Sequence, residues 1–335
     1  MKITKQFMAV AAAAVVACMA AACGAEKQSE AAQDQADKTE EQAEATTEGK
    51  LEKATSDKFK VYKAQTLLRT ADQVSDSAAA VYKDGEPQPY NYQRFRVVLY
   101  MPTQMAGESE AYVNDVLVPQ LLEAGFGERK RDTIDQTIAA FTRQDVRSAD
   151  NPNAKYVIEP DTADFLGYGV TESTVAIYPA LTSNIYLQFA VVKVFDSGSG
   201  MGAGISVNEH YVTIARQYQS WLSGDLEVRP TFIFGSGAPT PDILPLINDE
   251  MAQARSRGEG CLWDEGAARV PGNVRIVANG LGFIFDKYEV ACGADGNYMA
   301  VVPWDKISPF LAPRFNEWIA GARDVKTMPA PDIWE

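Results

Sequence analysis

Histidine is nearly absent from this chain, which has one imidazole, His210, among 335 residues. Any Ser-His-Asp or Cys-His nucleophilic site would have to use that single side chain. It lies in the run Asn208-Glu209-His210-Tyr211-Val212, at the start of an expected strand. A lone histidine in such a place is more often a surface or sheet-edge residue, so we assign no catalytic residues. We also expect no metal site and no cofactor, because zinc sites are typically built from several His and Cys side chains.

Cysteine is also scarce, with four residues in two separate places. Cys18 and Cys23 lie near the amino terminus, while Cys261 and Cys292 lie in the last third of the chain. An even pair in an oxidising compartment suggests a disulfide. A bond between Cys261 and Cys292 would contribute about 3 to 4 kcal/mol in the chain-entropy model.

No run of the sequence contains the roughly 20 strongly apolar residues that a membrane span needs. The apolar run 7–22 has 16 residues, mostly alanine, and follows the basic residues Lys2 and Lys5. It ends in Ala-Ala-Ala before Cys23 and Gly24. Small residues before a cysteine at the cut site are typical of a secretory signal, so residues 1–22 are predicted to be a signal peptide. A retained membrane span is the alternative.

The pattern resembles the lipobox of bacterial lipoproteins, which implies lipidation of the cysteine at the cut site. Cys23 is favoured because polar residues follow Gly24. Cys18, after Val-Val-Ala, is the alternative, but it would leave Met19 to Ala22 as an apolar start to the mature chain. A diacylglycerol with an amide-linked acyl chain such as palmitate anchors stably, since one chain alone binds only marginally. The resemblance places the rest of the chain at the cell envelope, facing the periplasm or the exterior.

Aromatic residues are missing from the segment after the lipobox. Residues 23–56 are rich in Glu, Gln, Ala, Lys and Thr, and no apolar face recurs at helical spacing. Such a composition buries too little apolar surface to offset the entropy of ordering. The segment is therefore predicted to be an acidic, flexible tether.

Positive charge is in deficit: the precursor has a formal charge of −14. Removing residues 1–22 removes Lys2, Lys5 and no acid, so the mature side chains sum to −16. An acidic surface disfavours nucleic acid as a partner and favours a basic one. Plain solubility is the alternative reason for the acidity.

The remaining residues alternate between β-branched apolar runs and amphipathic stretches, which predicts an α+β fold. We expect antiparallel sheets packed with helices in two closely associated subdomains. Strands are expected at 59–68, 95–100, 171–180, 184–195, 210–218, 274–278, 282–285, 289–291 and 298–303, and helices at 108–123, 132–145, 241–256 and 304–321. Gly125 is expected to stop the first helix, and Asn279-Gly280 to form a hairpin turn.

The carboxyl-terminal part carries a recognisable series of motifs. They are Asn273-Val-Arg-Ile276, Asn279-Gly-Leu-Gly-Phe-Ile-Phe285, Tyr288-Glu-Val-Ala291, Gly296 and Val302-Pro-Trp304. Residues 183–325 thereby resemble the extracytoplasmic domain of the lysozyme-sensing anti-sigma factor RsiV. Residues 57–182 resemble its PdaC/SigV-like amino-terminal partner. The resemblance implies this fold and a binding or sensing role. It implies neither anti-sigma nor deacetylase activity, because the sequence printed here holds neither a sigma-binding segment nor a deacetylase domain.

Two further features of the sequence are candidate contacts for a ligand. Gly198, Gly200, Gly202 and Gly204 stand where the family often has Gly-Gly-Ala-His, and such a loop could form part of a binding edge, or be a plain connection. It is not followed by the Lys-Ser or Lys-Thr of a phosphate loop. The aromatic residues Trp263, Tyr288 and Trp304 are expected to pack in the core or hairpins rather than stack on a ligand.

The sequence therefore predicts a membrane-anchored extracytoplasmic lipoprotein that acts as a non-enzymatic binding or sensing module. Its ligand would be a basic protein such as lysozyme or a wall-associated molecule. One alternative is a peptidoglycan hydrolase that uses paired carboxylates, which needs two acids a few ångströms apart. Asp264 and Glu265 are examples of acids that the sequence gives no reason to pair. A structural envelope lipoprotein is the other alternative.

Overall fold

The structure of the chain is a computed structural model. The model describes residues 57–70, 82–83, 86–87, 92–143, 146–148, 151–159, 170–197, 205–216, 228–292 and 296–331. Cys18, Cys23 and the whole of the predicted signal peptide and tether lie outside the described residues, as do Gly198, Gly200, Gly202 and Gly204.

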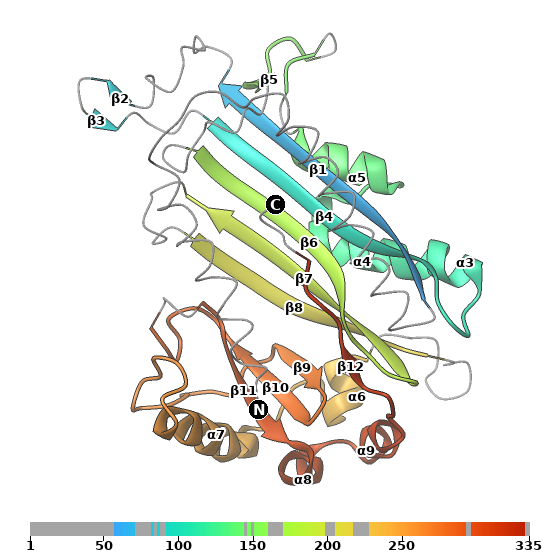
Figure 1. The fold of residues 1–335 in the computed structure, drawn as a ribbon, viewed down its shortest axis with the longest axis vertical. Coiled ribbons are helices and arrows are strands. Elements are labelled where there is room, and N and C mark those ends of the chain that lie inside the picture. The colour runs from blue at the N-terminus through green and yellow to red at the C-terminus, as the bar shows by residue number, and fades with distance from the viewer. Residues whose placement is uncertain are drawn as a thin grey trace, which may run out of the picture. The chain divides into compact units, whose positions relative to one another are not determined.

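A seven-stranded sheet forms the larger layer (Figure 1). Its order is β5-β1-β4-β6-β7-β8, and β12 pairs with one end of β6. The strands are β1 (Lys58–Thr70), β4 (Tyr92–Gln104), β5 (Tyr156–Glu159), β6 (Val170–Thr182), β7 (Tyr186–Asp196), β8 (Ile205–Ala215) and β12 (Lys326–Thr327). A separate pair joins β2 (Tyr82–Lys83) to β3 (Glu86–Pro87). Strands β6 and β7 are buried along most of their length, which explains their nearly continuous apolar sequences.

The expected α+β class with mostly antiparallel sheets is confirmed, with one parallel pair, β4 and β6. Residues 110–142, between these two strands, form a helical layer on one face of the sheet (Figure 1). It contains α3 (Glu110–Tyr112), the π-helix η2 (Val113–Leu117), α4 (Val118–Phe126), η3 (Gly127–Arg129) and α5 (Ile134–Thr142). A crossover of this length is what parallel pairing requires.

The helical layer packs on the sheet through an apolar core. The core joins Leu117, Leu121, Phe126 and Phe141 of the layer to Phe95, Leu99, Ile177, Phe189 and Ile214 of the sheet. The prediction that Gly125 stops the helix is wrong. Gly125 is buried inside α4, where an added Cβ would lie 2.8 Å from Cδ1 of Ile177, so the glycine lets the helix approach β6. The helix ends at Gly127, whose φ of 55° is left-handed.

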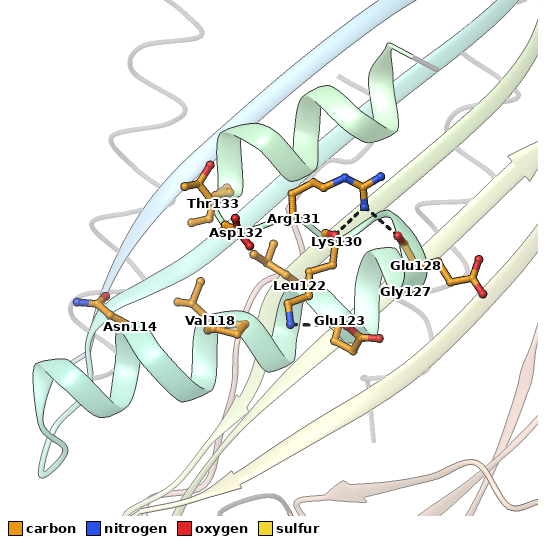
Figure 2. A pocket seen from close by; sticks show the side chains of 12 residues that line it. Asn114, Val118, Leu122, Glu123, Gly127, Glu128, Lys130, Arg131, Asp132 and Thr133 are labelled. Atoms are coloured by element: carbon orange, nitrogen blue, oxygen red, sulfur yellow. Dashed lines mark hydrogen bonds and ion pairs between the residues drawn. The ribbon is translucent and has the colours of Figure 1, made fainter. Parts of the chain in front are cut away.

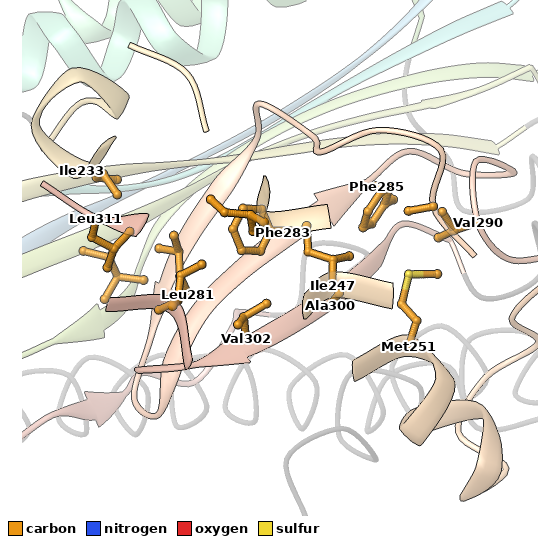
Figure 3. Close-up of a cluster of buried hydrophobic side chains, with 14 of the residues drawn as sticks. Ile233, Ile247, Met251, Leu281, Phe283, Phe285, Val290, Ala300, Val302 and Leu311 are labelled. Carbon is orange, nitrogen blue, oxygen red and sulfur yellow. The ribbon is translucent and has the colours of Figure 1, made fainter. Parts of the chain in front are cut away.

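A three-stranded sheet of order β11-β10-β9 forms a second core with the carboxyl-terminal helices. Its elements are α6 (Pro230–Phe234), η5 (Pro241–Ile243), α7 (Leu244–Ser256), β9 (Val274–Val277), β10 (Gly280–Phe285), β11 (Tyr298–Pro303), α8 (Trp304–Ile307), η7 (Ser308–Phe310) and α9 (Pro313–Ala320). Figure 3 shows Ile247 and Met251 of α7 beside Phe283 and Phe285 of β10. These four side chains are at most 1% exposed.

Four local expectations need correction. The hairpin between β9 and β10 is present, but Val277 pairs with Gly280, so its turn residues are Ala278 and Asn279. Gly280 belongs to β10, where a Cβ would lie 2.2 Å from the carbonyl oxygen of Val302. The predicted strand 210–218 begins earlier, at Ile205, because residues 205–210 pair with β7.

The other two corrections concern the end of the chain. Residues 289–291 form a turn and a single bridge rather than a strand. The helix expected at 304–321 is divided into α8, η7 and α9, because Pro309 and Pro313 cannot continue a helix. In the described ranges, no helix combines the length and the apolar character that spanning a membrane requires.

Candidate functional site

The outer surface of the helical layer carries a cavity of about 680 Å³ (Figure 2). It lies between α4 and the segment that leads into α5. Its lining residues are Asn114, Val118, Pro119, Leu122, Glu123, Gly127, Glu128, Lys130, Arg131, Asp132, Thr133 and Ile134. The hollow is wide open to solvent, and its lining combines apolar side chains with groups of both charges. We call this cavity the helical groove.

Local hydrogen bonds fix the segment that forms one wall of the helical groove. The Arg131 guanidinium donates to the carbonyl oxygens of Glu128 at 2.9 Å and Lys130 at 2.8 Å (Figure 2). The backbone N–H of Arg131 donates to Oγ1 of Thr137 at 2.9 Å. Thr133 then starts α5 with a capping box that it shares with Gln136. This wall is therefore a defined surface rather than a loose connection.

The opposite wall comes from α4 and the turn before it. Asn114 lies in the π-helix η2, a rare element that often marks functional sites. Lys130 reaches across to Glu123 of α4, with Nζ 3.7 Å from Oε2. Both side chains are partly exposed, so this ion pair contributes little to stability. Two further acids, Glu128 and Asp132, also line the groove.

The helical layer is strongly acidic. Residues 105–142 contain seven acids and three basic residues, which gives a formal charge of −4. The acids are Glu108, Glu110, Asp115, Glu123, Glu128, Asp132 and Asp135. All of them except Glu108 are exposed. This surface therefore attracts positively charged partners over a distance set by the salt concentration.

A half-buried polar cluster joins the two sheets. Arg275 of β9 donates to the Tyr211 hydroxyl at 2.7 Å, and that hydroxyl in turn donates to Glu209. Asn273 donates to the carbonyl oxygen of Glu209 at 2.7 Å. Burial and the charge of Glu209 raise the pKa of Tyr211, so its hydroxyl keeps the proton that it donates. The cluster ties β8 to β9, a structural task.

A second buried contact serves the same junction. The Gln188 side chain of β7 is fully buried, and both of its polar atoms lie 3.2 Å from the backbone N and O of Ile276. When the amide nitrogen of Gln188 faces the carbonyl oxygen of Ile276, the side chain donates one hydrogen bond to the β9 backbone and accepts one from it, as a neighbouring strand would. Its oxygen also accepts from the Thr213 hydroxyl at 2.8 Å.

His210 lies in β8, opposite Val191. Burial, followed by the positive charge of Lys193, lowers its pKa, so the imidazole is neutral at physiological pH. It does not line the helical groove. Within the described residues, no group of three or more His, Cys, Asp or Glu side chains is arranged to hold a metal ion.

Cys261 and Cys292 lie opposite each other on adjacent backbone segments. The N–H of Cys292 donates to the carbonyl oxygen of Cys261 at 3.0 Å, and the next residues, Leu262 and Ala291, form a bridge. Opposite residues in such a pair have Cα atoms about 4.5 to 5.5 Å apart, a separation that suits a disulfide. The disulfide itself stays a prediction.

The three aromatic residues singled out in the sequence have different environments. Trp304 packs on Phe315, with ring centroids 6.3 Å apart, as expected. Trp263 is 40% exposed and Tyr288 is 58% exposed, so the packing expected of these two is incomplete. Tyr288 also has a left-handed backbone, with φ of 68°, which costs a residue with a Cβ roughly 1 to 2 kcal/mol.

The sequence did not single out the residues of the helical groove. The available signal was the charged run 127–132, Gly-Glu-Arg-Lys-Arg-Asp, directly after an amphipathic helix. Such a run indicates a solvated loop, but nothing in it shows that the loop folds back beside α4.

Comparison with known proteins places a family domain in the carboxyl-terminal part. Residues 231–305 match the model of a family described as a protein of unknown function, DUF3298. The chain therefore carries a DUF3298 domain that runs from α6 to the start of α8. This agrees with the region where the sequence motifs lie. No curated protein matches the chain.

Two solved structures of DUF3298 proteins are similar to the chain. One is a member of the family from Bacteroides fragilis, with 13% identity and a TM-score of 0.49, matched over 78% of this chain and 96% of that chain. The other is a family protein from Pseudomonas aeruginosa PAO1, with 10% identity and a TM-score of 0.41, matched over 76% of this chain and 95% of that chain.

Proposed function

We propose that this protein is a non-enzymatic binding or sensing module of the cell envelope and that its helical layer contacts the partner. The observation that carries the proposal is the helical groove, a hollow of about 680 Å³ in the helical layer within residues 105–142, whose formal charge is −4, although the side chains that line the groove itself sum to −1. An acidic surface steers a basic protein and orients it, while the groove accepts an apolar side chain beside Val118 and Ile134, which are only partly buried. A lysozyme-like protein has the required chemistry.

The RsiV-like character of residues 183–325 and the PdaC/SigV-like character of residues 57–182 belong to the same proposal. In both cases the proposed role is recognition outside the cytoplasm. The match of residues 231–305 to the DUF3298 family supports a shared domain, but it supports no particular role, because the function of that family is unknown.

Binding to lysozyme in solution tests the proposal directly. We expect binding at low salt that weakens as salt increases, because screening shortens the reach of surface charges. The double charge reversal Glu123→Lys with Glu128→Lys should weaken binding by about tenfold or more at low salt. The matched control is Glu265→Lys with Glu317→Lys, which makes the same change of charge on exposed residues outside the helical layer. Equal loss in both variants would show attraction by net charge alone and would refute the helical groove as the contact.

The membrane attachment is a separate part of the proposal. A lipid on Cys23 would hold the folded part outside the membrane through the tether of residues 23–56. Metabolic labelling with a fatty-acid analogue should mark the wild-type protein and the Cys18→Ala variant but not Cys23→Ala. Label that persists in Cys23→Ala and disappears in Cys18→Ala would move the anchor to Cys18.

The helical groove also favours one alternative, a peptidoglycan hydrolase. Three carboxylates line the groove, those of Glu123, Glu128 and Asp132, and a glycoside hydrolase needs two. Release of soluble fragments from purified peptidoglycan would support this function if Glu128→Ala and Asp132→Ala each abolished it. The binding proposal predicts no release by the wild-type protein.

A further inference from the structure

A tight turn presents Tyr288 to solvent at one end of the three-stranded sheet. The turn follows β10 and is closed by the N–H of Glu289, which donates to the carbonyl oxygen of Asp286 at 3.0 Å. Tyr288 occupies the third position of this turn with φ of 68°. That position in a type II turn is normally glycine or asparagine, because a Cβ is unfavourable there. The sequence thus keeps an aromatic residue where glycine would fit best.

Contacts on both sides hold the turn in place. The Glu289 carboxylate accepts from the N–H of Asp286 at 3.2 Å and pairs with Arg269 at 2.8 Å. Lys287 donates from Nζ to the carbonyl oxygen of Ile205, in the larger sheet, at 3.0 Å. The position of the Tyr288 backbone is therefore determined by its neighbours and not by the tyrosine ring.

The ring contributes little to the folded core. Tyr288 is 58% exposed, the highest value among the large apolar side chains of the described ranges. Its only described ring contact is the Lys287 ammonium, 5.3 Å from the ring centroid. Residues that hold an unfavourable backbone conformation without gaining packing in return are found mainly at functional sites, so Tyr288 is a candidate for one.

A second exposed aromatic residue lies at the same end of the sheet. The N–H of Trp263 donates to the carbonyl oxygen of Val290 at 3.0 Å, two residues beyond Tyr288. Trp263 is 40% exposed, and the Arg255 guanidinium fixes its backbone by donating to the Trp263 carbonyl at 2.7 Å. Tyrosine and tryptophan offer large rigid contact surfaces that lose little entropy on binding.

The charges around these two rings are nearly balanced. The acids are Asp264, Glu265, Asp286 and Glu289, and the basic residues are Arg255, Arg269 and Lys287, so their sum is −1. Arg255 pairs with Asp264 at 3.4 Å and Arg269 pairs with Glu289 at 2.8 Å. Paired carboxylates and guanidinium groups beside flat apolar rings suit an uncharged ligand with hydroxyl groups on its edge.

We propose that Tyr288 and Trp263 form a carbohydrate-binding platform that takes a glycan of hexopyranose rings. The apolar face of each sugar ring stacks on an aromatic ring, and its hydroxyl groups hydrogen-bond to the neighbouring carboxylate and guanidinium groups. The site is separate from the helical groove, and it does not depend on the function proposed for that groove.

Calorimetric titration of the full chain with chitohexaose and with cellohexaose tests this site. We expect wild-type binding of at least one of the two, and the comparison shows whether the platform prefers N-acetylated sugars. Tyr288→Gly should weaken binding at least tenfold while its melting temperature stays equal or rises, because glycine relieves the left-handed strain. Trp263→Ala should also weaken binding, and the control Phe195→Ala, which changes another exposed aromatic residue, should not.

Two results would overturn the proposal. One is that the wild-type protein binds neither oligosaccharide at millimolar concentration. This result would overturn the glycan site even if Tyr288→Gly weakened binding to a protein partner. The other is Tyr288→Gly that binds as tightly as the wild type. The charge-reversal variant Glu123→Lys with Glu128→Lys should bind the oligosaccharides normally, so failure of the glycan site and failure of the helical groove are distinguishable.

Discussion

Asp57 and Arg216 form a buried, two-pronged ion pair across 159 positions of sequence. Nη1 of Arg216 lies 2.8 Å from Oδ1 of Asp57, and the two side chains are 7% and 0% exposed. Asp57 also accepts from the N–H of Ala106 at 2.9 Å, while Arg216 donates to the Ser183 carbonyl oxygen at 3.1 Å. One carboxylate thus connects the residue before β1, the segment that leads into the helical layer and the end of β8.

Removing one partner of this pair should destabilise the protein strongly. Asp57→Ala leaves the Arg216 charge buried without its carboxylate, which typically costs about 3 to 5 kcal/mol in the free energy of unfolding. Urea unfolding followed by circular dichroism measures the loss. The double variant Asp57→Leu with Arg216→Met should recover much of the stability, since an apolar pair can replace a buried ion pair. A double variant no more stable than Asp57→Ala would contradict this account.

Gly125→Ala should destabilise the contact between α4 and β6. The new Cβ would lie 2.8 Å from Cδ1 of Ile177 and 3.3 Å from Cγ1 of Val175, closer than packed carbon atoms normally come. Overpacking of this kind costs about 1 to 3 kcal/mol. The control is Gly272→Ala, where a Cβ would meet nothing within 4 Å. Thermal melting of both variants should show a lower transition temperature only for Gly125→Ala.

Acid should destabilise the protein through His210. Its pKa in the folded state lies below the ordinary value of 6.5, because of burial and the charge of Lys193. The unfolded chain then binds more protons than the folded one between these two pKa values, so stability rises with pH across that window. Melting temperatures of wild type should fall more steeply below about pH 6.5 than those of His210→Asn. Parallel curves for the two proteins would show that His210 carries no such linkage.

A disulfide between Cys261 and Cys292 should form under oxidising conditions. The two residues face each other across a backbone hydrogen bond, so closure requires little backbone movement. Non-reducing gel electrophoresis should show faster migration of the wild type than of Cys261→Ser, with the difference abolished by reductant. Identical mobility in the absence of reductant, together with two titratable thiols in the oxidised wild-type protein, would count against the bond.

Periodicity predicted most of the individual elements, because burial imposes it directly on the sequence. The apolar run of β7 and the apolar stripe of α4 are clear examples. Strand β7 covers most of the expected strand 184–195, whereas the helix expected at 108–123 is divided into α3, η2 and α4 and runs on to Phe126. The parallel pairing of β4 with β6 could not be predicted in this way. Pairing depends on which strand edges meet after the helical layer has crossed the sheet, and no local pattern records that choice.

The candidate sites show the same limit. The Tyr288-Glu289 motif was visible in the sequence, but its exposure depends on how Glu289, Lys287 and Arg269 hold the turn. The helical groove depends on the fold-back of residues 127–133 beside α4. Both sites arise from tertiary contacts between segments whose own sequences look like ordinary solvated loops.

The parallel pairing of β4 and β6 has a consequence for how the chain folds. Tyr92 pairs with Val170, so the helical layer must be traversed before the central strands of the large sheet can meet. Contacts this distant in sequence slow folding, because the entropy of closing the loop is lost before the strands can stabilise each other. A polypeptide that folds slowly exposes its apolar strands to other molecules for longer after synthesis, so these central strands should be the segments most prone to aggregation during folding.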